Sequence, residues 1–233
     1  TMACALADYT AADGRKLQIA LIEAGEITGR HAPERAGPIE GYQFDPRVVA
    51  LNEASIQFLS RLGLWSKVTE RRACAYAQMH VWDGEGTASI SFDSADLHAD
   101  YLGYIVENKV LIDILYDRLI TAENIILFVK NLVKSVDTTL AVEKHCEITT
   151  ESNKKIAAPL LLAADGAKST IREKLAFNTR EWAYDHTAIV TTVKTQKSHG
   201  HAAWQRFTAH GQLAFLPLLT ADGNTQYCSI VWS

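Results

Sequence analysis

The sequence predicts a mixed α/β fold in which αβ crossover units are interleaved with antiparallel strands. A continuous apolar run at 160–164 is typical of a strand covered on both faces of a parallel sheet. Alternating runs between 187 and 232 predict a separate antiparallel sheet. Helical spacing of apolar residues at 46–62 and 108–119 supplies the helices of the crossover units.

The amino-terminal half carries the first of these elements. Met2–Ala7 is typical of the tail of a helix, and Lys16–Glu23 alternates like a strand. Residues 25–43 form a long polar loop, which favours either a functional lid or a solvated connection. Pro46–Leu62 predicts a helix that Gly63 ends.

The remaining elements follow in order along the chain. Glycines at 84 and 86 lie between two short alternating runs and indicate a hairpin. The predicted elements are Gln78–Asp83 with Ala88–Asp93, helix Asn108–Leu119, strand Ile125–Val129, the pair Ser135–Val142 and His145–Thr150, strand Leu160–Ala164, helix Lys168–Leu175, and strands Thr187–Lys194, Ala203–Thr208, Leu213–Leu219 and Tyr227–Trp232.

Composition indicates an ordinary globular protein and excludes some classes of function. Of 233 residues, 48% are hydrophobic and 21% charged, which allows a sizeable core. The formal charge of −4 gives no broad basic field, so we expect no nucleic-acid partner. No apolar run approaches the ~20 residues of a membrane-spanning helix. The four cysteines are widely spread, and we expect reduced thiols in a cytoplasmic protein.

Glu23 is the first candidate for ligand binding. In a dinucleotide-binding βαβ unit, the second strand ends in an acid that binds the adenosine ribose hydroxyls. A helix remnant, a strand and this acid occur here in that order. An ordinary strand-end acid is the alternative reading of Glu23.

The second candidate is the segment from Leu160 to Arg172. A buried strand leads into Asp165 and Gly166, and a helix follows. Glycine permits a tight turn or a close approach to a ligand, and a helix amino terminus offers N–H groups to phosphate. A plain strand–turn–helix with Asp165 as helix cap is the alternative.

This segment resembles the "DG" motif of class A FAD-dependent aromatic monooxygenases, the family with the para-hydroxybenzoate hydroxylase fold. Within that family the ubiquinone-biosynthesis hydroxylases are most similar. Matching stretches span almost the whole chain in order. They are Arg47–Asn52, Phe58–Trp65, Met79–Asp83 with Ile90–Asp93, Gly103–Asn108, Asp165–Arg172, Ala214–Leu218 and Cys228–Ser233.

The resemblance implies a cofactor-binding role for eight residues. Glu23 would hold the adenosine ribose, and Arg47 would lie near the flavin or its phosphates. Glu107 or Asn108 would contact the ribityl chain, or else cap the helix that follows. Val129 would meet the adenine through its backbone. The DG role would fall to Asp165, Gly166 and Arg172.

The resemblance also implies how the chain is organised. An FAD-binding domain would comprise 1–75 and 103–180, and an interleaved β-sheet substrate domain 76–102 and 181–233. The family's GxGxxG turn is expected before Thr1 and its "GD" motif beyond Ser233, so the predicted fold is incomplete. We therefore expect these 233 residues alone to bind FAD weakly and not to hydroxylate.

The implied activity is hydroxylation of a polyprenylated phenol in ubiquinone biosynthesis. In the family, NAD(P)H reduces FAD, and the reduced flavin captures oxygen as a C4a-hydroperoxyflavin. The prenylated substrate suggests peripheral membrane contact and other ubiquinone-biosynthesis proteins as partners. Two alternatives remain: another FAD protein of this fold, such as an epoxidase, halogenase or prenyl reductase, and a non-catalytic remnant that binds partners.

Two further groups of residues are weaker candidates. His199 and His201, with His210 or His186, resemble a metal pair, but no acid or thiol lies at ligand spacing, and we assign no metal site. Four aromatic residues would line a substrate pocket or, as is commoner for strand aromatics, pack in the core. They are Trp182, Tyr184, Trp204 and Phe207.

Overall fold

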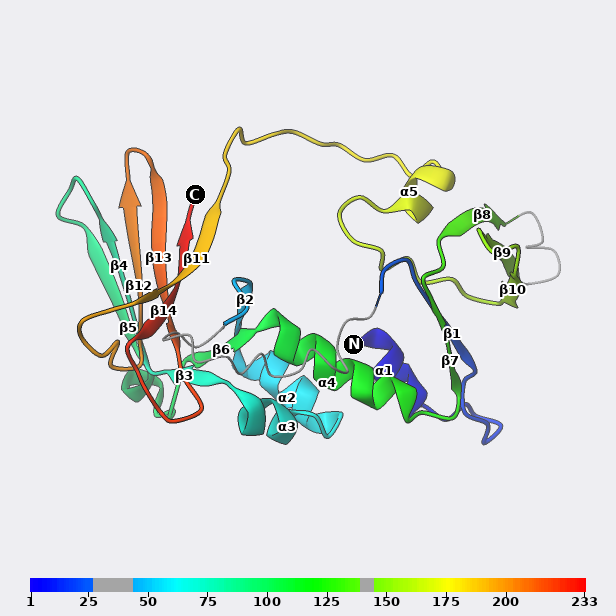
Figure 1. The fold of residues 1–233 in the computed structure, drawn as a ribbon, viewed down its shortest axis with the longest axis horizontal. Coiled ribbons are helices and arrows are strands. Elements are labelled where there is room, and N and C mark those ends of the chain that lie inside the picture. Colours follow the sequence, from blue (N-terminus) through cyan, green and yellow to red (C-terminus); the bar gives the residue numbers. More distant parts are fainter. Residues whose placement is uncertain (27–43, 139–144) are drawn as a thin grey trace, which may run out of the picture. The chain divides into compact units, whose positions relative to one another are not determined.

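The computed structural model describes residues 1–26, 44–138 and 145–233, and it confirms the predicted mixed α/β fold (Figure 1). The chain divides into two compact units. Unit 1 comprises Thr1–Thr28 and Arg118–Ala183, and unit 2 comprises Gly29–Asp117 and Tyr184–Ser233. The loop predicted at 25–43 lies mostly outside the described residues. The predicted domain boundaries, which differ from these units, stay a prediction.

Unit 1 is built on two parallel strands. β1 (Ile19–Glu23) pairs with β7 (Ile125–Val129), as expected for a crossover unit. The buried Asn124 precedes β7, and its amide donates to the carbonyl oxygens of Ala7 and Leu17 at 3.1 and 2.8 Å. These bonds join the end of α1 (Met2–Ala7) to the start of the parallel pair.

A small antiparallel sheet and a short helix complete unit 1. The predicted pair Ser135–Val142 and His145–Thr150 is confirmed as far as it is described, since residues 139–142 lie outside the described residues. A third strand, which the sequence analysis missed, extends it. The elements are β8 (Val133–Asp137), β9 (Cys146–Thr150), β10 (Lys155–Ala158) and α5 (Thr170–Lys174).

The predicted strand Leu160–Ala164 is wrong, because these residues adopt no regular structure. A strand needs a hydrogen-bonded neighbour, and none of the described strands pairs with this segment. Leu160 and Leu162 are 68% and 50% exposed. The segment instead lines an apolar pocket of about 760 Å³ together with Ile171 and Phe177.

Unit 2 contains a three-stranded sheet in which β6 is central. β6 (Gly103–Glu107) pairs antiparallel with β2 (Val48–Leu51) on one side and with β3 (Cys74–Tyr76) on the other. At Gly103 a Cβ would lie 2.5 Å from the Leu51 carbonyl oxygen, so only glycine fits between these strands.

The predicted helix Pro46–Leu62 begins later than expected. Residues up to Leu51 form β2, because they pair with β6, and α2 covers only Glu53–Arg61. Asn52 caps this helix by accepting a hydrogen bond from the Ser55 amide at 3.0 Å. The β-branched pair Val48 and Val49 suits the strand and should have indicated it.

Helices of unit 2 enclose one hydrophobic core. α3 (Trp65–Arg71), missed from the sequence, and α4 (Asn108–Ile120) pack with α2. The buried residues at its centre are Leu59, Leu64, Val68, Val106, Val110 and Ile114. A second cluster of Ile105, Leu218 and Tyr227 joins β6 to the larger sheet.

That larger sheet has six strands in the order β11-β14-β13-β12-β4-β5. The four predicted carboxyl-terminal strands are confirmed, but they are not separate, because β12 pairs in parallel with β4. The β4–β5 hairpin is confirmed, and the short helix η1 (Ser94–Leu97) follows it. The strands are β4 (Gln78–Asp83), β5 (Ser89–Asp93), β11 (Ile189–Lys194), β12 (Ala202–Thr208), β13 (Gly211–Leu218) and β14 (Tyr227–Trp232).

Across the part of the chain that is described, we find no helix with the length and apolar character needed to cross a membrane.

The cap of α2 gives a first test of the fold. Replacing Asn52 with Ala removes the bond to the Ser55 amide, and we expect a loss of about 1 kcal/mol in the free energy of unfolding. Asn52→Ser keeps an accepting oxygen and should lose far less. Urea unfolding of both variants measures the difference, and equal stabilities would show that Asn52 is not a cap.

Candidate cofactor-binding site

The eight residues predicted to bind a cofactor fall into two groups, one in each unit. Unit 2 holds Arg47, Glu107 and Asn108. Unit 1 holds the other five, which are Glu23, Val129, Asp165, Gly166 and Arg172. The binding of one cofactor by both groups stays a prediction.

In unit 1, Glu23 and Val129 lie side by side. They are register partners at the carboxyl ends of parallel strands, which is where open α/β sheets bind ligands. The exposed Glu23 carboxylate accepts a hydrogen bond from the Gly25 amide at 2.8 Å. One carboxylate oxygen is thus fixed by the turn, and the other is available to a hydroxyl group.

The turn after Val129 is a feature that the sequence analysis missed. Lys130 adopts a left-handed conformation at φ +55°, and its ammonium group lies 2.7 Å from Glu26. The side chain of Asn131 folds back so that its amide nitrogen Nδ2 donates to the Val129 carbonyl oxygen at 3.2 Å. These contacts fix the strand end where a nucleotide base would meet the backbone.

The Asp165–Arg172 segment forms a compact turn around one carboxylate. The Ser169 hydroxyl donates to Asp165 at 2.5 Å, and the Ile171 amide donates to it at 3.2 Å. Ser169 also caps α5 by accepting from the Arg172 amide at 3.0 Å. Partial burial alone would raise the Asp165 pKa, but the hydrogen bonds from Ser169 and Ile171 outweigh it and hold the pKa below its ordinary value.

Gly166 and Arg172 complete this turn. Gly166 has φ +87°, and the space where a Cβ would stand is open, so the backbone is accessible there. The Arg172 guanidinium donates to the Ala167 carbonyl at 2.6 Å and lies 3.6 Å from Glu181. Asp165 and Arg172 therefore stabilise the turn itself, while Gly166 leaves its outer side free. The capping alternative is wrong in its residue, because Ser169 and not Asp165 is the N-cap of α5.

In unit 2, Arg47 and Asn108 are joined through the backbone. The Asn108 amide donates to the Arg47 carbonyl at 2.9 Å, which places the start of β2 beside the start of α4. Arg47 is exposed, and Asn108 is half-buried. No carboxylate in the described ranges pairs with the Arg47 guanidinium, so its five N–H donors are available for an anion.

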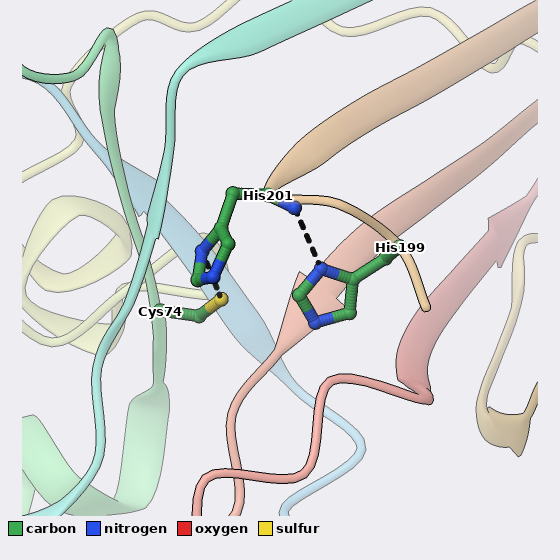
Figure 2. A group of neighbouring side chains, drawn as sticks. All are labelled: Cys74, His199 and His201. Carbon is green, nitrogen blue, oxygen red and sulfur yellow. Dashed lines mark hydrogen bonds between the residues drawn. The ribbon is translucent and has the colours of Figure 1, made fainter. Parts of the chain in front are cut away.

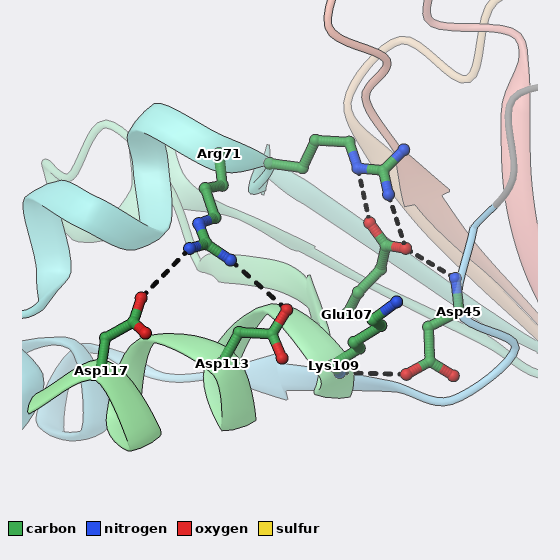
Figure 3. Close-up of polar contacts among 7 residues, drawn as sticks. Asp45, Arg71, Glu107, Lys109, Asp113 and Asp117 are labelled. Carbon is green, nitrogen blue, oxygen red and sulfur yellow. Dashed lines mark hydrogen bonds and ion pairs between the residues drawn. The ribbon is translucent and has the colours of Figure 1, made fainter. Parts of the chain in front are cut away.

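Glu107, by contrast, is bonded within the protein (Figure 3). It is only 4% exposed, and Arg72 holds both carboxylate oxygens, with Nε 2.8 Å from Oε2 and Nη2 3.1 Å from Oε1. The Asp45 amide donates to Oε1 at 2.6 Å. Burial raises the Glu107 pKa, although the Asp45 amide and the Arg72 charge oppose that rise.

Arg71, one residue before Arg72, makes longer ion pairs with two carboxylates. Arg71 lies between Asp113 and Asp117 on α4, 3.4 Å from each carboxylate (Figure 3). Its side chain is 46% exposed, against 28% for Arg72. The two neighbouring arginines thus allow a comparison between a short pair with a nearly buried carboxylate and two longer pairs, of which Arg71–Asp117 is exposed and Arg71–Asp113 has an 11% exposed carboxylate.

Arg72, Asp45 and Ser169 are site residues that the sequence analysis missed. Arg72 and Asp45 meet Glu107 from distant positions in the sequence, and no local pattern indicates such a contact. Ser169 carried a signal, because serine directly before a predicted helix is a preferred N-cap residue.

The four aromatic candidates do not pack in the core, although the sequence analysis gave that as the commoner outcome. Trp182 and Tyr184 are 65% and 76% exposed, and they lie outside regular structure. Trp204 and Phe207 are about 40% exposed on β12. An odd sequence separation places these two side chains on opposite faces of the sheet, so they do not line one pocket.

The histidine pair acquires a partner that the sequence did not indicate. Cys74, His199 and His201 lie together in unit 2, and one ligand atom of each lies within 4.8 Å of the others (Figure 2). Neither His186 nor His210 belongs to this group among the residues that the structure describes.

Unit 1 thus holds an acid at the carboxyl end of a parallel strand pair, which is the position where open α/β folds bind ligands. The chain belongs to the family described as "FAD binding domain", whose model matches residues 40–233. The expected family, fold class and FAD cofactor are thereby confirmed.

Curated relatives narrow the resemblance. The chain is 31% identical over 223 residues to 3-demethoxyubiquinol 3-hydroxylase of Escherichia coli strain K12, covering 94% of this chain and 54% of that protein. It is 32% identical over 241 residues to mitochondrial ubiquinone biosynthesis monooxygenase COQ6 of Danio rerio, covering 100% of this chain and 46% of that protein. The chain therefore spans about half the length of these relatives.

Solved structures agree on the fold. PqsL of Pseudomonas aeruginosa in complex with 2-aminobenzoylacetate superposes with a TM-score of 0.71 at 16% identity, over 99% of this chain and 56% of that one. HpxO of Klebsiella pneumoniae, complexed with FAD and uric acid, gives a TM-score of 0.65 at 13% identity, over 93% and 56%. At such identities the likeness concerns the fold alone.

The donors and acceptors present fit FAD in most positions. Glu23 offers a carboxylate oxygen for ribose hydroxyls, and Gly166 offers an accessible backbone. Arg47 offers phosphate or flavin a guanidinium that pairs with no carboxylate of residues 1–26, 44–138 and 145–233. Glu107 fits less well, because Arg72 and the Asp45 amide already occupy its carboxylate. Asn108 is the alternative contact for the ribityl chain, and its side-chain amide can both donate and accept hydrogen bonds.

Removing the buried arginine should be far more damaging than removing its exposed neighbour. Arg72→Met leaves Glu107 buried and unpaired, and we expect a loss of about 3 kcal/mol in the free energy of unfolding. Arg71→Met should lose less, about 1 kcal/mol, because both of its contacts are 3.4 Å long and the Asp117 carboxylate is 46% exposed, although the Asp113 carboxylate, 11% exposed, loses a partner. Chemical denaturation of both variants decides; similar losses would disprove the distinction.

The Asp165 turn predicts an acid-sensitive carboxylate. A pKa lowered on folding gives stability that is present above the unfolded pKa and is lost as pH falls through the folded one. Carbon-13 NMR titration should find the Asp165 pKa below its ordinary value, and Ser169→Ala should raise it. Ser152→Ala, which changes a hydroxyl elsewhere in unit 1, should leave it unchanged. A wild-type pKa at or above the ordinary value contradicts the turn geometry.

Proposed function

We propose that the protein acts in FAD- and NAD(P)H-dependent hydroxylation of a polyprenylated phenol ring in ubiquinone biosynthesis. The observation that carries this proposal is the alignment of nearly the whole chain, at 31–32% identity, with two hydroxylating enzymes named for that pathway. Because the chain spans about half of each, the activity is proposed for the whole protein.

Unit 1 is suited to hold the adenosine part of FAD. In this proposal the Glu23 carboxylate accepts hydrogen bonds from ribose hydroxyls, and the backbone at Val129 meets the adenine. Gly166 lets the pyrophosphate approach the turn closely, and Asp165 and Arg172 keep that turn in shape through Ser169 and Ala167.

Unit 2 is suited to position the reactive part of the cofactor. Arg47 offers its guanidinium to a phosphate or to negative charge on the flavin, and Asn108 offers an amide to the ribityl hydroxyls. Glu107 serves indirectly, because its ion pair with Arg72 fixes the strand that precedes Asn108. When bound, FAD supplies the redox and oxygen chemistry, and NAD(P)H supplies the electrons.

The domain assignment follows the same proposal. Residues 1–75 with 103–180 would bind FAD, and 76–102 with 181–233 would bind the phenol against the six-stranded sheet. The prenyl tail would keep the substrate near a membrane, so we expect peripheral contact with the bilayer from the cytoplasmic side. Other proteins of the pathway are the expected partners.

The proposal predicts a defined metabolic defect. Disrupting the gene should make its host accumulate a prenylated phenol that lacks one ring hydroxyl, because later steps need that group. Mass spectrometry of lipid extracts measures the intermediate. An unchanged quinone profile would refute the assignment to this pathway.

Complementation tests the site in the same strain. The wild-type gene should restore the quinone, and Arg47→Met should restore at least roughly tenfold less, since a charge-assisted contact to a bound anion is lost. Arg61→Met is the matched control on the last turn of α2 and should restore it fully. Equal rescue by both variants would remove Arg47 from the site.

A further inference from the structure

Three side chains from separate parts of unit 2 converge at one end of its sheets (Figure 2). Cys74 begins β3, while His199 and His201 lie in the turn before β12. The Cys74 sulfur is 4.0 Å from His201 Nδ1. A thiol and two imidazoles within 4.8 Å form a donor set typical of zinc and other thiophilic cations.

The hydrogen bonds of His199 give it the tautomer of a metal ligand. Its Nε2 lies 3.0 Å from the Leu218 carbonyl oxygen, and since a carbonyl only accepts, Nε2 carries the proton. Its Nδ1 accepts from the His201 amide at 3.0 Å and so carries the lone pair. Metal-binding histidines commonly donate their second N–H to a backbone carbonyl in this way.

His201 repeats that arrangement at a second carbonyl. Its Nδ1 lies 2.9 Å from the Ala75 oxygen, so this nitrogen carries a proton and donates it. Each imidazole thus donates one N–H to a backbone carbonyl. Binding an ion at His201 requires either a turn of the ring toward Cys74 or transfer of its proton to Nε2 with loss of the Ala75 bond.

The turn that carries the two histidines has an unusual backbone. Gly200 and His201 both have positive φ, at +59° and +57°. For a non-glycine residue this conformation is uncommon and is kept only where surrounding contacts hold it. Bonds from the Gly200 amide to Ser198 Oγ and from the Ala202 amide to the His199 carbonyl hold the turn, which directs both rings to one place.

Burial separates this cluster from an accidental surface group. Cys74 is 1% and His199 8% exposed, whereas His201 is partly exposed. Burial raises the pKa of the Cys74 thiol to about 12, and nearby Cys228 adds to the rise, so a bound cation must displace the thiol proton.

We propose that Cys74, His199 and His201 form a binding site for one thiophilic divalent cation of the zinc class. The cation binds the Cys74 sulfur and one nitrogen of each imidazole, and the partly exposed side at His201 leaves a fourth position to water. This proposal concerns unit 2 alone and does not depend on the proposed hydroxylation.

The binding step balances without redox chemistry. The S–H bond of Cys74 breaks, its proton passes to solvent, and a metal–sulfur bond forms. The His201 amide must also give up its bond to His199 Nδ1, since the same lone pair goes to the cation. These rearrangements oppose binding, and the metal–ligand bonds must exceed them.

The location suggests what the ion does. His201 and His199 already link the β3–β4 connection to the end of β13, through Ala75, Ala77 and Leu218. An ion held by Cys74 and both rings would fasten the same elements. Any ligand that binds the folded state alone raises stability by mass action, so the ion should raise the unfolding temperature of the protein.

Cobalt(II) tests the site because it reports thiolate ligation by its absorbance. Titrating the purified 233-residue protein with Co²⁺ should saturate at one ion per chain with a thiolate-to-cobalt charge-transfer band and tetrahedral visible bands. Zn²⁺ should bleach these bands by displacement and raise the unfolding temperature. A folded wild-type protein without a charge-transfer band would overturn the proposal.

Variants assign the ligands. Cys74→Ala should abolish the charge-transfer band, and His201→Asn, at the half-exposed position, should weaken Co²⁺ binding at least roughly tenfold. Cys146→Ala and His210→Asn change the same residue types outside the cluster and should bind as the wild type does. Circular dichroism checks the fold of each variant. A band that survives Cys74→Ala, or one that Cys146→Ala removes, would also overturn the proposal.

Discussion

The ion pair between Glu107 and Arg72 is the interaction on which the organisation of unit 2 depends. It closes the carboxyl end of β6 against the end of α3 and, through the Asp45 amide, against the segment that enters β2. β6 is the central strand of its sheet, so a shift there would move β2 and β3 together. Arg47 precedes β2 and Asn108 follows β6, so this buried pair also sets the separation of two proposed cofactor contacts.

The sequence predicted elements well where periodicity and turn chemistry agreed. The β4–β5 hairpin, α4 and the four carboxyl-terminal strands lie close to their expected positions. It failed where a non-local partner decides the structure. Val48–Leu51 is a strand because β6 lies beside it, and Leu160–Ala164 is not a strand because no described strand pairs with it. The local sequence pattern does not indicate which distant segments pair. Strands depend on such pairing more than helices do.

The same reason limits what could be foreseen about the sites. The DG segment is local, so its acid, glycine and arginine could be identified in order, although the cap proved to be Ser169 and not Asp165. Glu107 was identified as a candidate, but its engagement with Arg72 depends on a contact between distant segments. The histidine pair lacked a thiol within ligand spacing, and Cys74, which supplies one, lies about 125 positions before His199 in the chain. A site built from residues that are distant in the sequence can be identified only once the three-dimensional arrangement of their strands is known.

The parallel pairing of β12 with β4 has a consequence for how the protein is made. β4 and β5 emerge from the ribosome as a two-stranded hairpin, and the strand that covers the β4 edge follows roughly 120 residues later. Until then that edge offers unpaired N–H and C=O groups to any passing strand. The whole of Arg118–Ala183 is synthesised in the interval. The large sheet of unit 2 is therefore completed late. The nascent chain is most open to misassembly and chaperone binding while residues 118–183 of unit 1 are being synthesised.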